Sequence, residues 1–187
     1  MGRDANNQMF PIAWAVVGVE NKNNGCWFLS LLSNDLNLND GAGLTVISDG
    51  HKGLLEAVKI WLPDAEHRQC TRHIYANFKK KWSGLQFKTS SSMNEQFLEV
   101  MEEIKALDEN AYTWLVNHDP NTWCRAYFEV DRSCTAFEDG ISESFNSKIL
   151  SARGKPIIKM LEDIRVYIMQ RVWFLNKTAL VLNDSIT

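Results

Sequence analysis

The chain of 187 residues is long enough for one domain with a sizeable hydrophobic core. Its formal net charge of −3 argues against a uniformly basic coat, so any nucleic-acid-binding surface must be a local patch. The four cysteines lie at irregular spacing, and the sequence shows neither a signal peptide nor an apolar run of membrane-spanning length. We therefore expect a soluble intracellular protein and exclude membrane-spanning and disulfide-stapled classes.

The first predicted element is a β-strand over residues 9–19. The segment GRDANNQ has the composition of a turn, and the apolar run that follows it is rich in Val and Ile. We interpret the two together as the second half of a β-hairpin. The pairing partner of this strand is then expected before Met1.

A strand and two helices follow. NKNNGCWFLSLLSNDLNL predicts a helix after an Asn-rich start, and GLTVIS predicts a short buried strand over residues 44–48. After a turn at Asp49-Gly50, the apolar positions Leu54, Leu55, Val58 and Trp61 predict a second helix, which Pro63 ends.

The remaining elements are mainly helical. AEHRQCTRHIYANFKKKW is either a very short strand that runs into a helix or a single helix, and residues 93–128 are predicted to be mostly helix. The aromatic side chains Trp114, Trp123, Tyr127 and Phe128 are expected in the core. The last element begins near Ser142, is interrupted at 152–156 and resumes over 157–174, which predicts an α/β core with an all-helical stretch inside it.

Two carboxylates are candidates for chemistry. Asp49 follows a buried strand at the carboxyl edge of a sheet, where α/β folds build their sites, although Asp-Gly is also a common turn. Glu143 lies in the first turn of a helix, where the helix dipole alone would favour it, and it points away from the stripe Ile141, Phe145 and Ile149. Brought together, Asp49 and Glu143 would hold Mg²⁺ or Mn²⁺.

Four blocks, in order and over nearly the whole chain, resemble the core of plant Mutator-like element (MULE) transposases. They are DANNQMFPIAWAVVGVEN, the SDG after the second strand, AEHRQCTRHIYANF and GISESFNSKILSARGKPIIKMLEDIR. The resemblance implies a single domain over 1–187 with a ribonuclease-H-like α/β fold, and an all-helical insertion over about 75–130. In this family Asp, Asp and Glu bind two divalent ions that serve to cut and join DNA, and Asp49 and Glu143 match the second Asp and the Glu.

The first aspartate of the family has no counterpart here. It belongs to a strand before the GRDANNQ hairpin, and Asp4 matches the hairpin-turn aspartate instead. We therefore expect a core that is incomplete at its N-terminus, with its first strands missing. The chain would be a fragment of a DDE-type DNA transposase that is inactive alone. The resemblance further implies a nuclear location, transposon-end DNA as partner, and a homodimer or higher oligomer as one assembly.

Cys70 and His73 form a Cys-x-x-His pair that matches a family motif and has the spacing of half a zinc site. Further ligands could come from His67, His118, Cys124 or Cys134, but their spacings match no familiar zinc finger. The alternative is a buried structural pair that orients its helix.

Two basic groups are candidates for DNA contact. Lys79, Lys80 and Lys81 with Trp82 could follow phosphates and stack on a base, or could be the solvated end of a helix. Arg153 and Lys155 lie near the end of the Glu143 helix, which would point towards the scissile strand if the resemblance holds.

Two rival functions stay open. One is a domesticated relative of the far-red-response type, in which the same fold binds DNA or regulates transcription without cleavage. The other is an unrelated interaction domain whose helical stretch binds protein.

Overall fold

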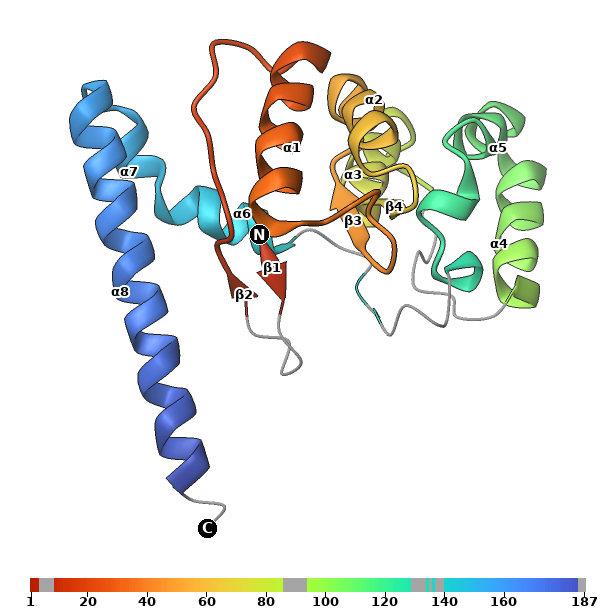
Figure 1. Ribbon diagram of the computed structural model, residues 1–187. Helices are drawn as coiled ribbons and strands as arrows, with labels where there is room; N and C mark the ends of the chain where they lie inside the picture. Colours follow the sequence, from red (N-terminus) through yellow and green to blue (C-terminus); the bar gives the residue numbers. More distant parts are fainter. Residues whose placement is uncertain (4–8, 86–93, 129–133, 135, 137–139, 185–187) are drawn as a thin grey trace. The chain divides into compact units, whose positions relative to one another are not determined.

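The computed structural model describes residues 1–3, 9–85, 94–128, 134, 136 and 140–184 (Figure 1). They divide into two compact units. Unit 1 comprises Met1–Trp14 and Gly140–Thr187, and unit 2 comprises Ala15–Asp139. Unit 1 contains one cluster of buried apolar side chains and unit 2 contains two.

Unit 1 begins with a short antiparallel pair, β1 (Gly2–Arg3) and β2 (Met9–Phe10), in which Gly2 faces Phe10. The partner of β2 therefore lies within the chain, and our expectation of a partner before Met1 is wrong for this strand. The predicted strand over 9–19 is also wrong beyond Phe10. Pro11 follows at once, and a proline has no N–H to donate to a strand ladder. Asp4 and the turn residues 5–7 lie outside the described residues.

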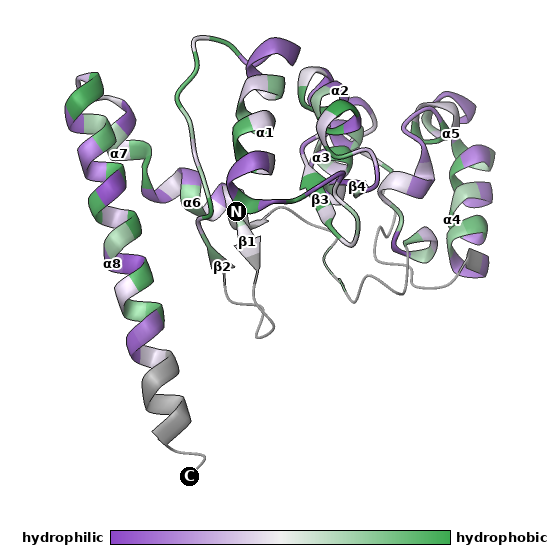
Figure 2. Ribbon diagram, viewed as in Figure 1, coloured by the Kyte–Doolittle hydropathy of each residue, from purple (hydrophilic) through white to green (hydrophobic). Residues whose placement is uncertain are grey.

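The rest of unit 1 is helical. Its helices are α6 (Gly140–Lys148), α7 (Leu150–Arg153) and α8 (Ile157–Asp184). The interruption between α7 and α8 falls where the sequence predicts it, and α8 runs beyond the predicted end at 174. The buried residues of this unit are Phe145, Ile149, Ala152, Met160 and Ile164, with Trp14 packed against them. Hydrophobic and hydrophilic residues alternate along the coloured part of α8, as expected for a helix with only one side in a core (Figure 2).

The first part of unit 2 alternates helix and strand. Its elements are α1 (Lys22–Leu36), β3 (Thr45–Ser48), α2 (Lys52–Trp61), β4 (Glu66–Gln69) and α3 (Thr71–Lys81). The predicted helices, the strand over 44–48 and the turn at Asp49-Gly50 are confirmed. For residues 66–81 the structure selects the first alternative, a short strand that runs into a helix. β3 and β4 are parallel, in the register Thr45 to Glu66 through Ser48 to Gln69.

Helices α1 and α2 lie side by side over one cluster of buried residues, Leu29, Ala57, Val58 and Leu62 (Figure 1). The Asn21 side chain caps α1 by accepting from the Asn24 N–H at 2.9 Å. The helix ends at Asn37, whose φ of 50° lies in the left-handed region. The Asn-rich start of this helix thus supplies the residue that caps its N-terminus.

The second part of unit 2 is the predicted helical stretch. It contains α4 (Asn94–Leu107), α5 (Glu109–Val116) and two 3-10 turns, η1 (Pro120–Thr122) and η2 (Arg125–Tyr127). Residues 86–93 and 129–130 of the expected insertion lie outside the described residues. The Asp108 side chain caps α5 at the Ala111 N–H, at 3.0 Å, and thereby separates α4 from α5.

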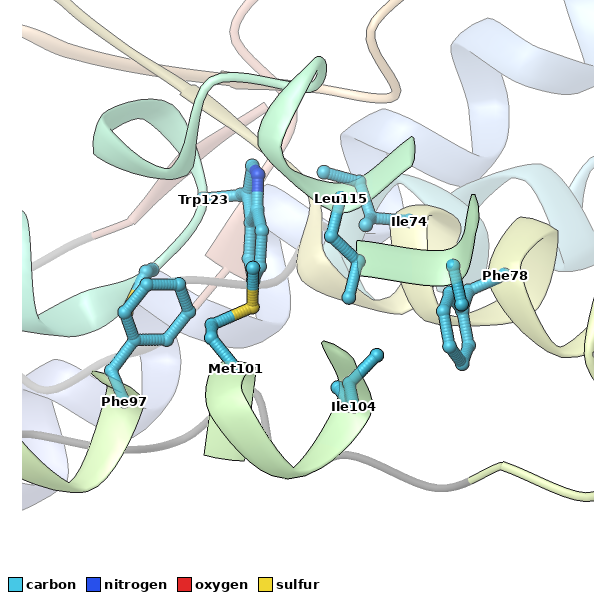
Figure 3. Packing of buried hydrophobic residues seen from close by; sticks show 9 residues of the cluster. Ile74, Phe78, Phe97, Met101, Ile104, Leu115 and Trp123 are labelled. Atoms are coloured by element: carbon cyan, nitrogen blue, oxygen red, sulfur yellow. The ribbon is translucent and has the colours of Figure 1, made fainter. Parts of the chain in front are cut away.

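A large aromatic and aliphatic core joins these helices to α3 (Figure 3). Its buried members are Ile74, Phe78, Phe97, Met101, Ile104, Ala111, Leu115, Trp123 and Cys124. Trp123 is fully buried, with its ring edge-on to Phe97 at a centroid distance of 5.7 Å. The expected core role of Trp123 is confirmed, while Trp114, Tyr127 and Phe128 are half-buried. Because α3 supplies Ile74 and Phe78, the helix after β4 belongs to this core.

The described fold is mixed α/β, mostly helical, with a small parallel two-stranded sheet. Among the described strands, β2 pairs with β1 and β3 pairs with β4. Because β2 belongs to unit 1 and β3 to unit 2, the expected sheet containing both residues 9–19 and 44–48 stays a prediction. The single domain over 1–187, the insertion over 75–130 and the ribonuclease-H-like arrangement stay predictions. Within the described ranges, every helix is too short or too polar to cross a membrane.

Candidate functional site

Asp49 lies at the carboxyl end of β3 and its side chain is exposed. Its Oδ1 atom accepts a hydrogen bond from the His51 N–H at 3.2 Å, so the carboxylate closes a turn that leads into α2. This is the local role that the Asp-Gly pair allows. An ionised carboxylate has about four acceptor positions, so an exposed Asp49 can serve the turn and bind a cation as well.

The residue after Asp49 has to be compact. Gly50 has a φ of +84°, and a Cβ atom added to it would lie 2.9 Å from Oε1 of Gln69. The Gln69 amide in turn donates to Oγ1 of Thr122 at 2.8 Å and to the His118 carbonyl at 3.3 Å. The end of the parallel sheet is thus tied to the helical part of unit 2 at η1.

The serine that precedes Asp49 contacts a histidine of the neighbouring strand. The Ser48 hydroxyl oxygen is 2.9 Å from Nε2 of His67, and it also accepts from the Gly50 N–H at 3.3 Å. Burial, with a smaller contribution from the positive charge of Lys59, lowers the pKa of His67 below its ordinary value. A neutral His67 ring can accept a hydrogen bond from the Ser48 hydroxyl, which helps to hold the last residue of β3 in place.

Glu143 lies in the first turn of α6 and is half-buried. Two members of the predicted stripe, Phe145 and Ile149, are buried in the core of unit 1, and the side chain of Ile141 lies outside what the structure describes. Asp49 belongs to unit 2 and Glu143 to unit 1. Their joint site therefore stays a prediction.

The basic residues expected to contact DNA are placed as follows. Lys79, Lys80 and Lys81 form the last turn of α3 and are exposed. Arg153 donates from Nη2 to Oδ1 of Asn146 at 2.7 Å. Lys155 makes an ion pair with Asp163 at 2.6 Å. The hydrogen bonds from Lys155 and Lys159 lower the pKa of Asp163, so a phosphate would have to compete with a charged partner for Lys155.

Trp82, which the sequence suggests as a stacking platform, makes internal contacts. Its Nε1 donates to Oδ2 of Asp108 at 3.0 Å, and its ring packs against Phe78 and Trp114 at centroid distances of 5.1 and 5.8 Å. The Lys81 ammonium lies 5.4 Å from the Trp114 ring centre. Trp82 therefore anchors the end of α3 to the helical core.

The family model described as the MULE transposase domain matches residues 1–77. Over these residues the chain is similar to the MULE transposase domain. The match contains both short sheets, α1, α2 and most of α3, and with them Asp49, Cys70 and His73. The resemblance seen in the sequence is thus confirmed for this segment. Neither curated proteins nor solved structures give a significant match to the chain.

The MULE segment supplies one of the two candidate metal carboxylates, Asp49, whereas Glu143 lies beyond residue 77. Carboxylate oxygens are the donors that Mg²⁺ and Mn²⁺ prefer, so the chemistry of both residues fits the implied ions. Over the described residues, His, Cys, Asp and Glu nowhere form a group of three or more that could hold a metal ion. The two-metal site stays a prediction.

The zinc hypothesis concerns Cys70 and His73, at the start of α3 in the MULE segment. Cys70 is fully buried, and its N–H donates to the Ser48 carbonyl at 2.7 Å. Of the additional ligands considered, His118 has Nδ1 at 2.8 Å from the Trp114 carbonyl. Burial raises the pKa of the Cys124 thiol, although a hydrogen bond at Ala126 opposes this, and the thiolate that zinc needs is disfavoured. The buried position of Cys70 fits the alternative of a structural pair that orients its helix, and zinc binding stays a prediction.

Sequence reasoning missed Ser48 and Gln69, which build the surroundings of β3's end, and it considered His67 only as a further zinc ligand. Each touches a residue far away in the chain, and their types alone carry no signal for that contact. The parallel register of β3 and β4, with Val46 opposite His67 and Ser48 opposite Gln69, is the observation that brings them together.

Proposed function

We propose that the chain is part of a DDE-type DNA transposase, in which metal-dependent chemistry cuts DNA and joins it to a new site. The observation that carries the proposal is the MULE match over residues 1–77. Asp49 supports it, because an exposed carboxylate stands at the carboxyl end of β3 inside the matched segment.

In this proposal Asp49 and Glu143 hold the divalent ions. Bound Mg²⁺ or Mn²⁺ would activate water or a DNA 3′-hydroxyl and stabilise the leaving oxygen. The chain carries two of the three carboxylates that the resemblance implies. Without the third carboxylate, the charge of two ions is less well compensated and the distance between them is no longer fixed. We therefore expect little or no cleavage by this chain alone.

The proposed partner is DNA at the ends of a transposon, and the proposed compartment is the nucleus. The exposed ammonium groups of Lys79, Lys80 and Lys81 would contact phosphates, with Arg153 and Lys155 as a second group. Contacts to phosphate carry no sequence information, so they would position the DNA without selecting the target. A homodimer would bring two transposon ends together.

A nicking assay on DNA carrying the terminal repeats tests the proposal. It compares this chain with a chain extended upstream by strands that restore an aspartate beside Asp49, in Mg²⁺ or Mn²⁺. We expect the extended chain to cleave DNA, and its Asp49→Asn and Glu143→Gln variants to lose at least about 100-fold in cleavage rate. Replacing a residue that binds the metal should cost more activity than replacing a residue that only supports a metal ligand. Glu103→Gln, which removes an exposed carboxylate of α4, is the matched control and should leave the rate unchanged.

Two results would contradict this proposal. Robust cleavage by the unextended chain would show that another residue completes the site. DNA binding without cleavage by the folded, metal-loaded extended chain would favour the domesticated DNA-binding module instead.

A further inference from the structure

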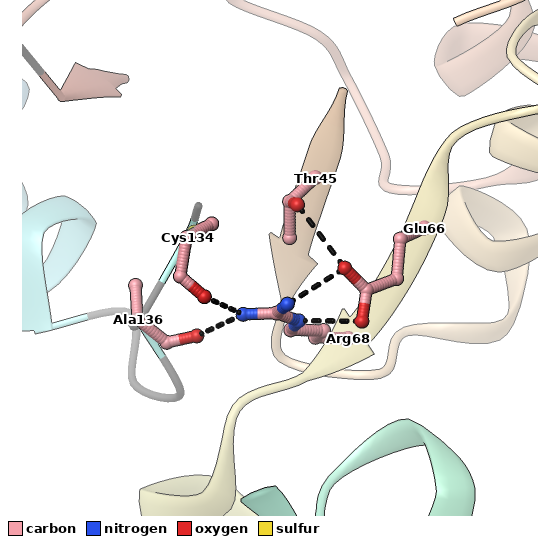
Figure 4. Close-up of polar contacts among 5 residues, drawn as sticks. All are labelled: Thr45, Glu66, Arg68, Cys134 and Ala136. Atoms are coloured by element: carbon pink, nitrogen blue, oxygen red, sulfur yellow. Dashed lines mark hydrogen bonds and ion pairs between the residues drawn. The ribbon is translucent and has the colours of Figure 1, made fainter. Parts of the chain in front are cut away.

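Arg68, in the middle of β4, is a buried cation with all of its outer nitrogens engaged (Figure 4). Its side chain has no exposed surface. Nε and Nη2 donate to the two carboxylate oxygens of Glu66 at 2.9 and 2.7 Å. Nη1 donates to the carbonyl oxygens of Cys134 and Ala136 at 2.7 and 2.8 Å.

The surroundings complete this arrangement. Thr45, on β3, donates its hydroxyl to Oε2 of Glu66 at 3.2 Å, and the Phe128 ring lies 4.0 Å from Cζ of Arg68. A buried ion pair contributes to the folded state only when its geometry is good and its remaining hydrogen-bonding groups are satisfied. Both conditions hold for the contacts of Arg68.

The carbonyl contacts join distant parts of the chain. Cys134 and Ala136 lie 66 and 68 positions after Arg68. They also stand immediately before α6, which begins at Gly140 and carries Glu143. On the other side, Arg68 is opposite Ile47 in the parallel sheet, two residues before Asp49. One side chain thus ties Cys134 and Ala136 to the sheet whose strand β3 ends just before Asp49.

We propose that Arg68 is a positioning residue for metal binding at Asp49, a clamp that holds the backbone at Cys134 and Ala136 against the β3–β4 sheet. Lysine could not replace it, because four hydrogen bonds from one planar group are needed at once and an ammonium is a compact point charge with three donors. The clamp itself stands on the observed contacts, whereas its role in metal binding rests on the proposed function.

The chain contains its own reporters for a test. Cys134 lies in the clamped segment and is half-buried, whereas Cys70 and Cys124 are fully buried elsewhere in unit 2. The rate at which a thiol reagent labels each cysteine, read by peptide mass spectrometry, separates local release of Cys134 and Ala136 from unfolding of the unit. The full chain is compared with Arg68→Lys and with the control Arg125→Lys, which alters an exposed arginine of η2.

A second variant keeps the test decisive if Arg68→Lys fails to fold. Arg68→Met combined with Glu66→Leu removes both charges and leaves apolar side chains of similar size, which folded proteins usually tolerate better than a single unpaired charge. In this variant and in Arg68→Lys we expect Cys134 to be labelled at least about tenfold faster, since charged hydrogen bonds are lost. Cys70 and Cys124 should stay protected, and Arg125→Lys should match the unmodified chain.

The Mn²⁺ affinity of the same proteins, measured by electron paramagnetic resonance, tests the positioning role, with Asp49→Asn marking the affinity that depends on the site. We expect both Arg68 variants to bind Mn²⁺ more weakly. Unchanged labelling of Cys134 would overturn the clamp. Faster labelling with unchanged Mn²⁺ affinity would overturn the positioning role. Equal Mn²⁺ binding by the unmodified chain and Asp49→Asn would refute the metal site and hence the positioning role. In that case the labelling rate of Cys134 would still test the clamp.

Discussion

At the scale of single residues, the end of β3 is held by hydrogen bonds from both near and distant neighbours. Asp49 accepts from His51 within its own turn, while Ser48 contacts His67 on the next strand. The first contact follows from the Asp-Gly pair and is predictable from the sequence. The second requires the parallel register of two strands, and no local pattern indicates it.

His67 makes the stability of this region depend on pH. Because its pKa in the folded chain is lowered from 6.5, the unfolded chain takes up the proton first as the pH falls. The full contribution of His67 to the free energy of unfolding is present above the ordinary pKa of the ring and is lost as the pH falls below it. We expect the free energy of unfolding to fall between pH 7.5 and 5.5, by no more than about 1.4 kcal/mol per pH unit from this one group.

Urea unfolding at several pH values checks this prediction. His67→Gln removes the titrating group and keeps a side chain able to hydrogen-bond, so the pH dependence should become shallower. His51→Gln changes an exposed histidine and should keep the slope of the unmodified chain. Equal slopes for the unmodified chain and His67→Gln would contradict the assignment.

At the scale of elements, α1 and α2 come together through residues without large side chains. A Cβ atom added to Gly53 would lie 2.6 Å from the backbone carbon of Asn21 and 2.7 Å from the Lys22 nitrogen. One added to Gly25 would lie 3.0 Å from Cβ of Ala57. The start of α1 therefore sits directly against the backbone of α2, and this contact places the turn after Asp49 that leads into α2.

Gly53→Ala should destabilise the chain even though alanine is the better helix former. The propensity gain is about 1 kcal/mol, whereas overpacking against rigid backbone costs about 1–3 kcal/mol and sometimes more. The midpoint of urea unfolding should therefore fall. Gly84→Ala adds the same methyl group where no atom of the described residues lies within 4 Å, and its midpoint should change little. A higher midpoint for Gly53→Ala would show that helices α1 and α2 are farther apart than described.

At the scale of the whole molecule, the chain divides into two units with separate cores. Both clusters of buried residues that belong to unit 2 are built only from residues of that unit. The Arg68 contacts to Cys134 and Ala136 also lie within it. Unit 2 is continuous in sequence, which allows it to be tested by itself.

A chain of residues 15–139 should fold independently, because it retains both of its cores. Circular dichroism should show helix with a cooperative thermal transition, and Cys70 and Cys124 should resist a thiol reagent as they do in the full chain. The double variant Leu115→Ala with Val58→Ala removes buried side chains from both cores and should abolish that protection, since each change costs roughly 1–5 kcal/mol. Rapid labelling of Cys70 and Cys124 in the unaltered fragment would show that unit 2 depends on unit 1.

The sequence by itself determined the helices α1, α2 and α8, the strand β3 and the candidate carboxylates Asp49 and Glu143. These follow from apolar periodicity, helix-breaking prolines and motif resemblance, which are local properties of the chain. Only the tertiary structure decided that β2 pairs with β1 and that Arg68 is buried against Cys134 and Ala136. The physical reason is that pairing and burial depend on which distant surfaces meet, whereas local propensity depends only on residues within a few positions of one another.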